Sequence, residues 1–276
     1  VSFPRASPPI MALSLPMEGG ASYALADVSG NNISTYTSGD PSWSAASGHD
    51  GFGAWIFDGD DCLGAGEKFP TGASYTKTAW VYRTGSGTNG GNNIISGDVG
   101  AGGHAFWAPD SYGNRLSAGH NSHWNTVQDP VSLALNTWCF VAVSFDYSTG
   151  EMVLYKNDIE VDRATVPGTD LNVTDQTIYI GAFAANHHFM GTIDDARVYN
   201  RALSASQISA LYNGNIATIM ADETVADEEW QAFVTPYSDS EKGVTVASNP
   251  LQVVASPGVE ISSVTLSGAT PEATTA

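Results

Sequence analysis

The stretch GTIDDARVYNRALSASQISALYNG, residues 191–214, decides the fold of this chain because it joins two different hydrophobic periods. In its first half the apolar residues Ile193, Ala196 and Val198 alternate with charged residues, as the buried positions of a half-exposed strand do. We therefore expect a strand over residues 192–199 that closes a sheet.

The second half of the stretch has the spacing of a short helix. Ser204 is a good N-cap, and Gly214 ends the run. The apolar residues that recur at helical spacing are Leu203, Ile208, Leu211 and Tyr212. A strand that runs directly into one short helix is an uncommon pattern, and it guides the interpretation of the residues before it.

The first 200 residues consist of strand-like runs separated by clusters of Gly, Pro, Asn and Asp. No long helical period occurs before Ser204. This spacing predicts an all-β fold, an antiparallel two-sheet jelly-roll sandwich with one short C-terminal helix. The clearest expected strands are Gly53–Asp58, Thr76–Arg83, Asn92–Gly97, Ala105–Ala108, Arg115–Gly119, Thr137–Asp146, Glu151–Lys156, Ile159–Thr165, Gln176–Ala182 and Thr192–Tyr199.

Several motifs resemble those of laminin-G-like, concanavalin A-like jelly-roll domains, in the expected order over residues 11–214. They are DVSGN at 27–31, GAWIFDG at 53–59, TKTAWV at 76–81, NTWCFVA at 136–142 and the closing stretch itself. The hairpin MVLYKN at 152–157 also resembles the family, although Asp158 stands where glycine is usual. The resemblance implies the jelly-roll fold, and it implies no particular ligand.

After Gly214 the composition changes. An acidic stretch at 222–230 precedes WQAFVTPYSD (230–239) and GVTVASNPLQVV (243–254), which predict two alternating strands joined by an acidic turn. They resemble the last strands of immunoglobulin-like modules in large prokaryotic surface proteins, and the earlier strands of such a module are missing. We expect residues 1–217 to form the jelly roll, with an extension at 1–10, and residues 218–276 to form an incomplete Ig-like segment and tail.

Ile261–Leu266 has the pattern of the opening strand of a further module. The half-sheet at 230–276 would leave unpaired edges. Either the chain is part of a longer tandem protein, or another copy completes this sheet by β-strand complementation.

The charge of the chain excludes some partners. Ten Lys and Arg against 29 Asp and Glu give a net charge of −19, which repels phosphate backbones and anionic membranes. No apolar run is long enough to span a bilayer, so we expect neither nucleic-acid binding nor membrane insertion. Few lysines and abundant Gly, Ser, Thr, Asn and Trp favour an extracellular, secreted or cell-surface protein.

The two cysteines, Cys62 and Cys139, lie in expected strands, and they are either one disulfide or two buried thiols. Asn32 and Asn172 begin N-x-S/T sequons in expected loops and are candidates for glycosylation.

The family resemblance also implies a structural Ca²⁺ between the DVSGN turn and the closing strand. Carried over by position, its ligands are Asp27, Asn31 and Asp194, with Asp195 a weaker candidate. The alternative is that Asp27 forms an Asx-turn and that Asp194 pairs with Arg197 or Arg201.

Aromatic and amide side chains around residues 107–125 suit a sugar, which stacks on rings and bonds to polar groups. The expected ligand-binding set is Trp107, His120, Asn121, Trp124 and Asn125, with Trp124 in a loop. Trp80 and Trp138 are expected in the core between the sheets. All six histidines lie in the jelly roll, and a three-imidazole metal site is the less favoured interpretation.

The sequence contains no recognisable catalytic motif. The nearest approach to the paired carboxylates of a glycosidase is Glu160 with Asp162, and Thr165 stands where a third acid would be needed. We therefore expect a non-catalytic surface or adhesion module that binds glycans or matrix and could also self-assemble. A polysaccharide-active enzyme, or its carbohydrate-binding accessory domain, is the alternative.

Overall fold

The computed structural model describes most of the jelly roll and short pieces after it. The described residues are 11–100, 103–214, 218–220, 229–230, 233–234, 244, 246–252 and 263–265.

One layer of the fold is an eight-stranded antiparallel sheet. Its order is β13-β12-β11-β6-β15-β4-β3, and β1 adds to the end of β15. The strands are β1 (Met11–Leu15), β3 (Ser42–Ser44), β4 (Ala54–Asp58), β6 (Tyr75–Arg83), β11 (Trp138–Asp146), β12 (Glu151–Lys156), β13 (Ile159–Thr165) and β15 (Met190–Tyr199).

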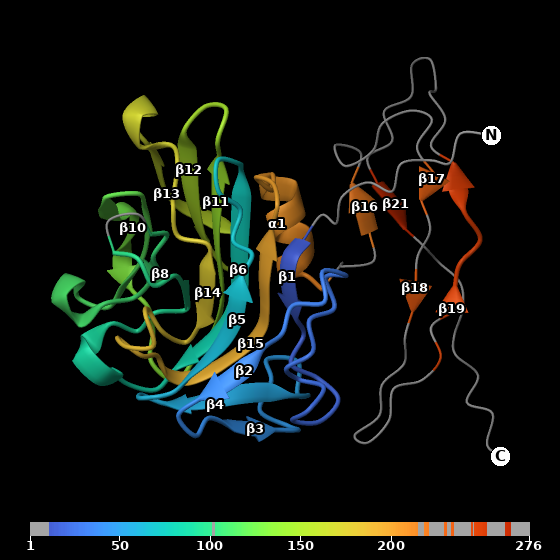
Figure 1. Cartoon of the computed structure of the whole chain (residues 1–276), viewed down its shortest axis with the longest axis horizontal. Helices are drawn as coiled ribbons and strands as arrows, with labels where there is room; N and C mark the ends of the chain where they lie inside the picture. Colours follow the sequence, from blue (N-terminus) through green and yellow to red (C-terminus); the bar gives the residue numbers. More distant parts are fainter. Residues whose placement is uncertain are drawn as a thin grey trace.

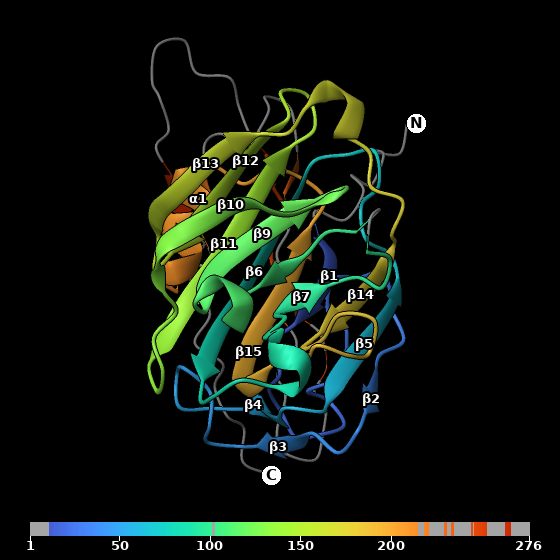
Figure 2. The same cartoon turned by 90° about the vertical axis from the view of Figure 1, so that its left-hand side faces the viewer.

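The second layer lies across the first and is built from two shorter sheets, β10-β9-β8 and β2-β5-β14-β7 (Figures 1 and 2). Backbone bonds join the two, since Ile94 N donates to Phe106 O at 2.8 Å and Ala108 N to Asn92 O at 3.0 Å. The strands are β2 (Tyr36–Ser38), β5 (Cys62–Glu67), β7 (Ile95–Ser96), β8 (Phe106–Trp107), β9 (Arg115–His120), β10 (His123–Ser132) and β14 (Thr177–Ile180). The predicted antiparallel jelly-roll sandwich is confirmed.

Three 3-10 turns and one α-helix complete the jelly roll. They are η1 (Thr88–Gly90), η2 (Asp110–Tyr112), η3 (Gly168–Asp170) and α1 (Ala205–Tyr212). No helix among the described residues has the length and apolar character needed to cross a membrane.

The closing stretch forms the predicted strand β15 and helix α1. Ser204 Oγ accepts from Gln207 N, and the Gln207 side chain accepts from Ser204 N, so the N-cap is a capping box. Ile193 and Ala196 are both buried although three positions separate them. A bulge between Asp194 and Arg197, with Asp195 at φ 52°, supplies the residue that breaks the period of two.

Trp80 lies outside the inter-sheet core, contrary to expectation. Along β6, Ala79 and Val81 face the other layer, so the alternation turns Trp80 outward. There it packs with Phe140 and Tyr212 in a second apolar cluster. Trp138 is half-buried and packs against Tyr82.

After α1, three short strand pairs are described within this chain. The predicted hairpin is present, because β17 (Glu229–Trp230) pairs with β20 (Leu251–Gln252) and β18 (Phe233–Val234) with β19 (Val246–Ala247). The expected opening strand pairs differently. β21 (Ser263–Thr265) joins β16 (Thr218–Met220) and begins no further module within the described residues. The rest of 218–276, and the extension 1–10, lie outside the described residues.

The two cysteines are free, buried thiols, so a disulfide between them is wrong for this fold. Cys62 is on β5, which pairs with β2 and β14, whereas Cys139 is on β11, between β6 and β12 in the other sheet. Burial raises the pKa of the Cys62 thiol to about 11 and also raises that of Cys139.

We expect iodoacetamide to label neither cysteine in the native protein, because only the thiolate of an accessible cysteine reacts. In denaturant without reductant both should be alkylated, giving two adducts by mass spectrometry. Unfolded protein that takes up no label would contradict the free-thiol assignment.

His120 is part of the interior, and its expected role as a ligand residue is therefore wrong. It follows Leu116 and Ala118 on the inward face of β9 and is 1 % exposed. Its Nε2 lies 2.8 Å from Leu171 O and its Nδ1 2.9 Å from Tyr75 Oη, an arrangement that suits a neutral ring. Burial lowers its pKa to about 4, although the bond to Leu171 O opposes the shift.

This pKa predicts that acid destabilises the fold. Since the folded pKa of His120 is lowered from 6.5 to about 4, the unfolded chain binds the proton first as the pH falls. The stability contribution is complete above about pH 6.5, and about 3 kcal/mol is lost as the pH approaches 4. In urea titrations between pH 6.5 and 4, His120→Gln should lose less of its free energy of unfolding than the wild type does. His123→Gln, at an exposed ring, should lose as much as the wild type. If both variants lost the same free energy of unfolding, His120 would not be the cause of the acid destabilisation.

Candidate functional site

The outer face of the second layer carries a group of exposed aromatic rings at the start of β10 and along β8. On β8, Phe106 faces the core, so the alternation turns Trp107 outward. Trp124 is 38 % exposed and its ring centroid lies 5.4 Å from that of Trp107. Tyr112 of η2, 48 % exposed, lies 6.3 Å from Trp107 on another side.

Hydrogen bonds fix the orientation of Trp107. Its Nε1 donates to Asn125 Oδ1 at 3.0 Å and to Trp124 O at 3.2 Å. Trp124 itself lies on strand β10, which begins at His123, and not in a loop as we expected. Of the expected ligand-binding residues, the structure brings Trp107, Trp124 and Asn125 together.

Asn121 is bonded away from these rings. It is half-buried in the turn between β9 and β10 at φ 22°, where its backbone N donates to Gly103 O at 3.0 Å.

Two further rings join the group from the loop after β14, and neither was among the expected ligand-binding residues. Phe183 meets Trp124 edge-on at 5.0 Å between centroids, and His187 lies 6.3 Å from Phe183. The run of Asn and His at 186–188 signalled a polar surface loop, but Phe183 had no distinguishing signal. Its place depends on tertiary contacts alone.

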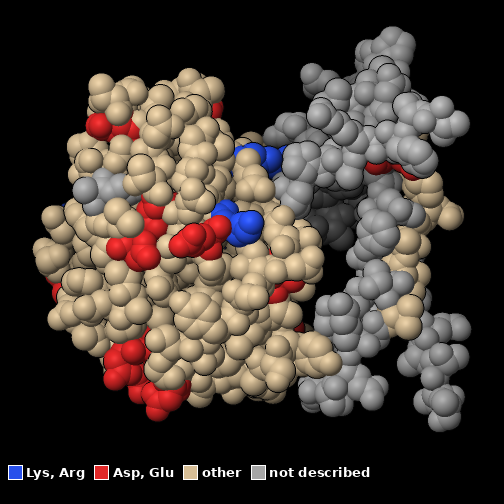
Figure 3. All heavy atoms as spheres, in the orientation of Figure 1, with Lys and Arg blue, Asp and Glu red and all other residues tan. Residues whose placement is uncertain are grey.

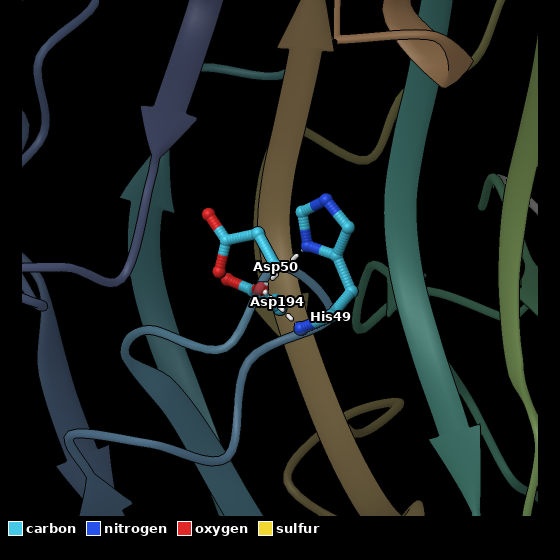
Figure 4. A group of neighbouring side chains, drawn as sticks. All are labelled: His49, Asp50 and Asp194. Atoms are coloured by element: carbon cyan, nitrogen blue, oxygen red, sulfur yellow. Dashed lines mark hydrogen bonds and ion pairs between the residues drawn. The ribbon is translucent and has the colours of Figure 1, made fainter.

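A second candidate site is a carboxylate group where the loop at 48–53 crosses β15 (Figure 4). His49, Asp50 and Asp194 offer ligand atoms within 4.8 Å of one another. Asp194 Oδ2 accepts from His49 N at 3.1 Å and lies 2.7 Å from His49 Nδ1. Glu18 approaches the same loop and accepts from Gly53 N at 2.9 Å.

The electrostatics of this group indicate an excess of negative charge. Burial raises the pKa of Glu18 to about 7, and the charges of Asp194, Asp50 and Asp195 add to the shift. Burial also raises the pKa of Asp194. Burial opposes protonation of His49, but its bond to Asp194 and the surrounding carboxylates outweigh that effect and raise its pKa.

The oxygens of this group fit a hard cation. Asp194 Oδ1 is buried and has no hydrogen-bond partner. A Cβ placed on Gly48 would lie 2.7 Å from Gly53 O and 2.9 Å from both Phe52 O and Asp194 Oδ2. The glycine thus lets the Phe52 carbonyl, which accepts from Gly48 N at 2.7 Å, and the Asp194 carboxylate lie close together, and carboxylate oxygens are ligands that Ca²⁺ prefers.

The expected partners Asp27 and Asn31 serve the fold elsewhere. Asp27 accepts from Ser29 N at 2.9 Å and from Ser14 N at 3.1 Å, so it forms the Asx-turn that was the alternative. Asn31 Nδ2 donates to Met11 O at 2.8 Å, which ties this turn to β1. Asp195 pairs with Arg197 at 2.6 Å.

A second acidic group joins Asp40, from the loop between β2 and β3, to three residues at the turn between β4 and β5: Asp58, Asp60 and Asp61. The buried Asp61 already accepts from Asp40 N at 2.9 Å and from Asp58 N at 3.0 Å, so it has a structural role. On the face shown in Figure 3, acidic side chains form several groups and few basic ones are visible.

The remaining candidates are a three-histidine metal site, the glycosidase-like carboxylates and two glycosylation sites. No group of three histidines converges among the described residues. Arg163 bonds to Glu160 at 2.7 Å and holds its pKa below the usual range, whereas a general acid needs a raised pKa. Asn32 and Asn172 are exposed on loops, and their glycosylation stays a prediction.

The two-layer antiparallel jelly roll defines the chain as a concanavalin A-like β-sandwich. The family model described as the concanavalin A-like lectin/glucanases superfamily (Laminin_G_3) matches residues 57–209. The chain belongs to this family. No curated protein matches the sequence at a significant level.

Solved structures share the fold. Domain 4 of AbnA, a GH43 extracellular arabinanase from Geobacillus stearothermophilus in complex with arabinotriose, is 21 % identical with a TM-score of 0.55; the match covers 73 % of this chain and 98 % of that one. The binding domain of botulinum neurotoxin DC in complex with rat synaptotagmin II is 18 % identical, with a TM-score of 0.53. That match covers 74 % of this chain and 51 % of the toxin domain, so the chain spans about half of it. These identities establish the fold alone.

Proposed function

We propose that this protein is a non-catalytic, extracellular or cell-surface module that binds glycans through Trp107 and Trp124. The observation that carries the proposal is the pair of outward indole rings, 5.4 Å apart, with Asn125 orienting one of them. Sugars bind by stacking their apolar faces on such rings while amides and carboxylates bond to the hydroxyls.

Two further points support a binding role. The arabinanase domain of similar fold is described in complex with arabinotriose, and this chain covers nearly all of that domain. The carboxylates weighed for glycosidase chemistry, Glu160 and Asp162, are engaged by Arg163 and by Gln128 N respectively. An enzyme acting on polysaccharide is therefore the less supported alternative.

Replacing Trp124 tests the proposed glycan site. The full chain should be retained in affinity gels by at least one neutral polysaccharide, with arabinan included in the panel. Trp124→Ala should lose about tenfold or more in affinity, because a central aromatic contact is removed. Trp138→Ala, which removes a half-buried Trp from the outer face of the other layer, should bind as the wild type. If Trp138→Ala lost affinity and Trp124→Ala did not, the glycan site would lie on the outer face of the other layer.

We also propose that Asp50 and Asp194 hold a structural Ca²⁺, with Glu18, which bonds to the same loop at Gly53 N, as a further carboxylate ligand. The buried, unpartnered Asp194 Oδ1 and the raised pKa values of Glu18 and Asp194 support this. The cation would neutralise carboxylates that otherwise repel one another, and it would fix the 48–53 loop on β15. It takes no part in binding at the rings.

Calcium should raise the melting temperature of the wild type. At about 100 times the Kd, the free energy of unfolding should rise by about 3 kcal/mol. Asp194→Asn and Glu18→Gln should each abolish most of this response in thermal melts. Asp60→Asn, in the other acidic group, is the matched control and should respond as the wild type. If calcium still raised the melting temperature of Asp194→Asn, the ion would not bind at this site.

Self-assembly through residues 230–276 stays a prediction. The described strand pairs of this region are formed within one chain, and they give assembly no specific support.

A further inference from the structure

The aromatic rings on the second layer form a row. In the order Tyr112, Trp107, Trp124, Phe183 and His187, here called the ring row, neighbouring centroids are 6.3, 5.4, 5.0 and 6.3 Å apart. Within this set each ring contacts only the one before and the one after it. The contacts follow one another from Tyr112 to His187, and neighbouring ring planes are inclined by 59°, 44°, 80° and 52°.

All five rings are at least partly accessible. Tyr112 and Trp124 are exposed, and Trp107, Phe183 and His187 are half-buried. They come from three separate segments: β8 with η2, the start of β10, and the loop after β14. Figure 2 shows β9, which pairs with β8, and β10 on the layer that faces the viewer. An accessible group of rings from three segments offers a sugar chain more than one stacking contact.

The supports of the row are rigid. Trp107 is held by two hydrogen bonds from its indole N–H. The loop that carries Phe183 and His187 is closed by Phe183 N to Asn186 O and Asn186 N to Phe183 O, each 2.8 Å. Asn89 Nδ2 of η1 also bonds to Asn186 Oδ1 at 2.8 Å. A pre-organised surface loses little entropy when a chain settles on it.

The charge around the row is negative. Asp110 stands in η2 with Tyr112, and Asp170 pairs with His123, which precedes Trp124. Together with the net charge of −19, these carboxylates repel the acidic groups of uronic and sialic acids. The site therefore favours uncharged sugars, which offer only hydroxyl groups.

We propose that the ring row binds an internal stretch of an uncharged, linear polysaccharide that lies along it, with Trp107 and Trp124 as the central contacts. This inference rests on the glycan function proposed above and adds the ligand class and its direction. A chain that passes along the row needs no free end, and each ring adds one more stacking contact.

The test is the dependence of affinity on chain length, measured with the full protein by calorimetry. The probes are linear arabino-, cello-, xylo- and manno-oligosaccharides of one to six units, together with oligogalacturonides as anionic probes. For at least one neutral series, affinity should rise with each added unit until the row is filled and then level off. Methyl glycosides, whose reducing end is blocked, should bind as well as the free sugars.

Variants at the two ends of the row separate it from a single-ring site. Tyr112→Ala and His187→Ala should each weaken the longest probes by about threefold to tenfold and leave disaccharides unchanged, since each removes one distal contact. Trp124→Ala should weaken probes of every length. Trp138→Ala should weaken none of them.

Three outcomes would overturn the inference. Affinity that saturates at one or two units, or that requires a free end, would indicate a terminal-sugar pocket and leave the glycan function intact. Tighter binding of oligogalacturonides would contradict the uncharged class. The absence of binding to any probe would reject both this inference and the proposed function.

Discussion

The pairing of β15 is the constraint on which the rest of the structure depends. Its first half pairs with β4, its second half with β1, and both halves pair with β6. One strand thus holds three neighbours, with β6 along one edge and β4 followed by β1 along the other. The bulge between Asp194 and Arg197 interrupts its ladder with β6 near the point where β4 gives way to β1.

The residue before this bulge is a buried carboxylate that bonds to His49 of the 48–53 loop. Asp194 turns to the outer face of the sheet, where the 48–53 loop covers it and leaves Oδ1 without a partner. Burying a carboxylate that is only half satisfied costs free energy unless charge of the opposite sign is supplied. His49 supplies part of it, and a bound cation would supply more. Structure and candidate metal site therefore have one origin in the strand that closes the sheet.

The glycan candidate lies on the other layer and depends on a different arrangement. The short strands β7 and β8 leave room for η1, η2 and the loop after β14 to meet over the outer face of the sheet. Aromatic side chains from segments about 70 residues apart, such as Trp107 and Phe183, become parts of one surface through this meeting. A rigid sandwich with variable connections is a common basis for binding, since loops can change without loss of the core.

Periodicity in the sequence determined the sandwich, the strand at 192–199, the capped helix after it and most of the strands between. These features are local, because hydrophobic spacing and capping residues act within one turn or one strand. The phase of alternation could also have assigned His120 to the interior, since it follows Leu116 and Ala118 at a period of two. Only the tertiary structure decided that Cys62 and Cys139 stay apart, that Asp194 meets His49 and Asp50 instead of Asp27 and Asn31, and that Phe183 joins the rings. Each of these outcomes concerns residues far apart along the chain. The order in which the strands pair in the two sheets decides whether such residues meet.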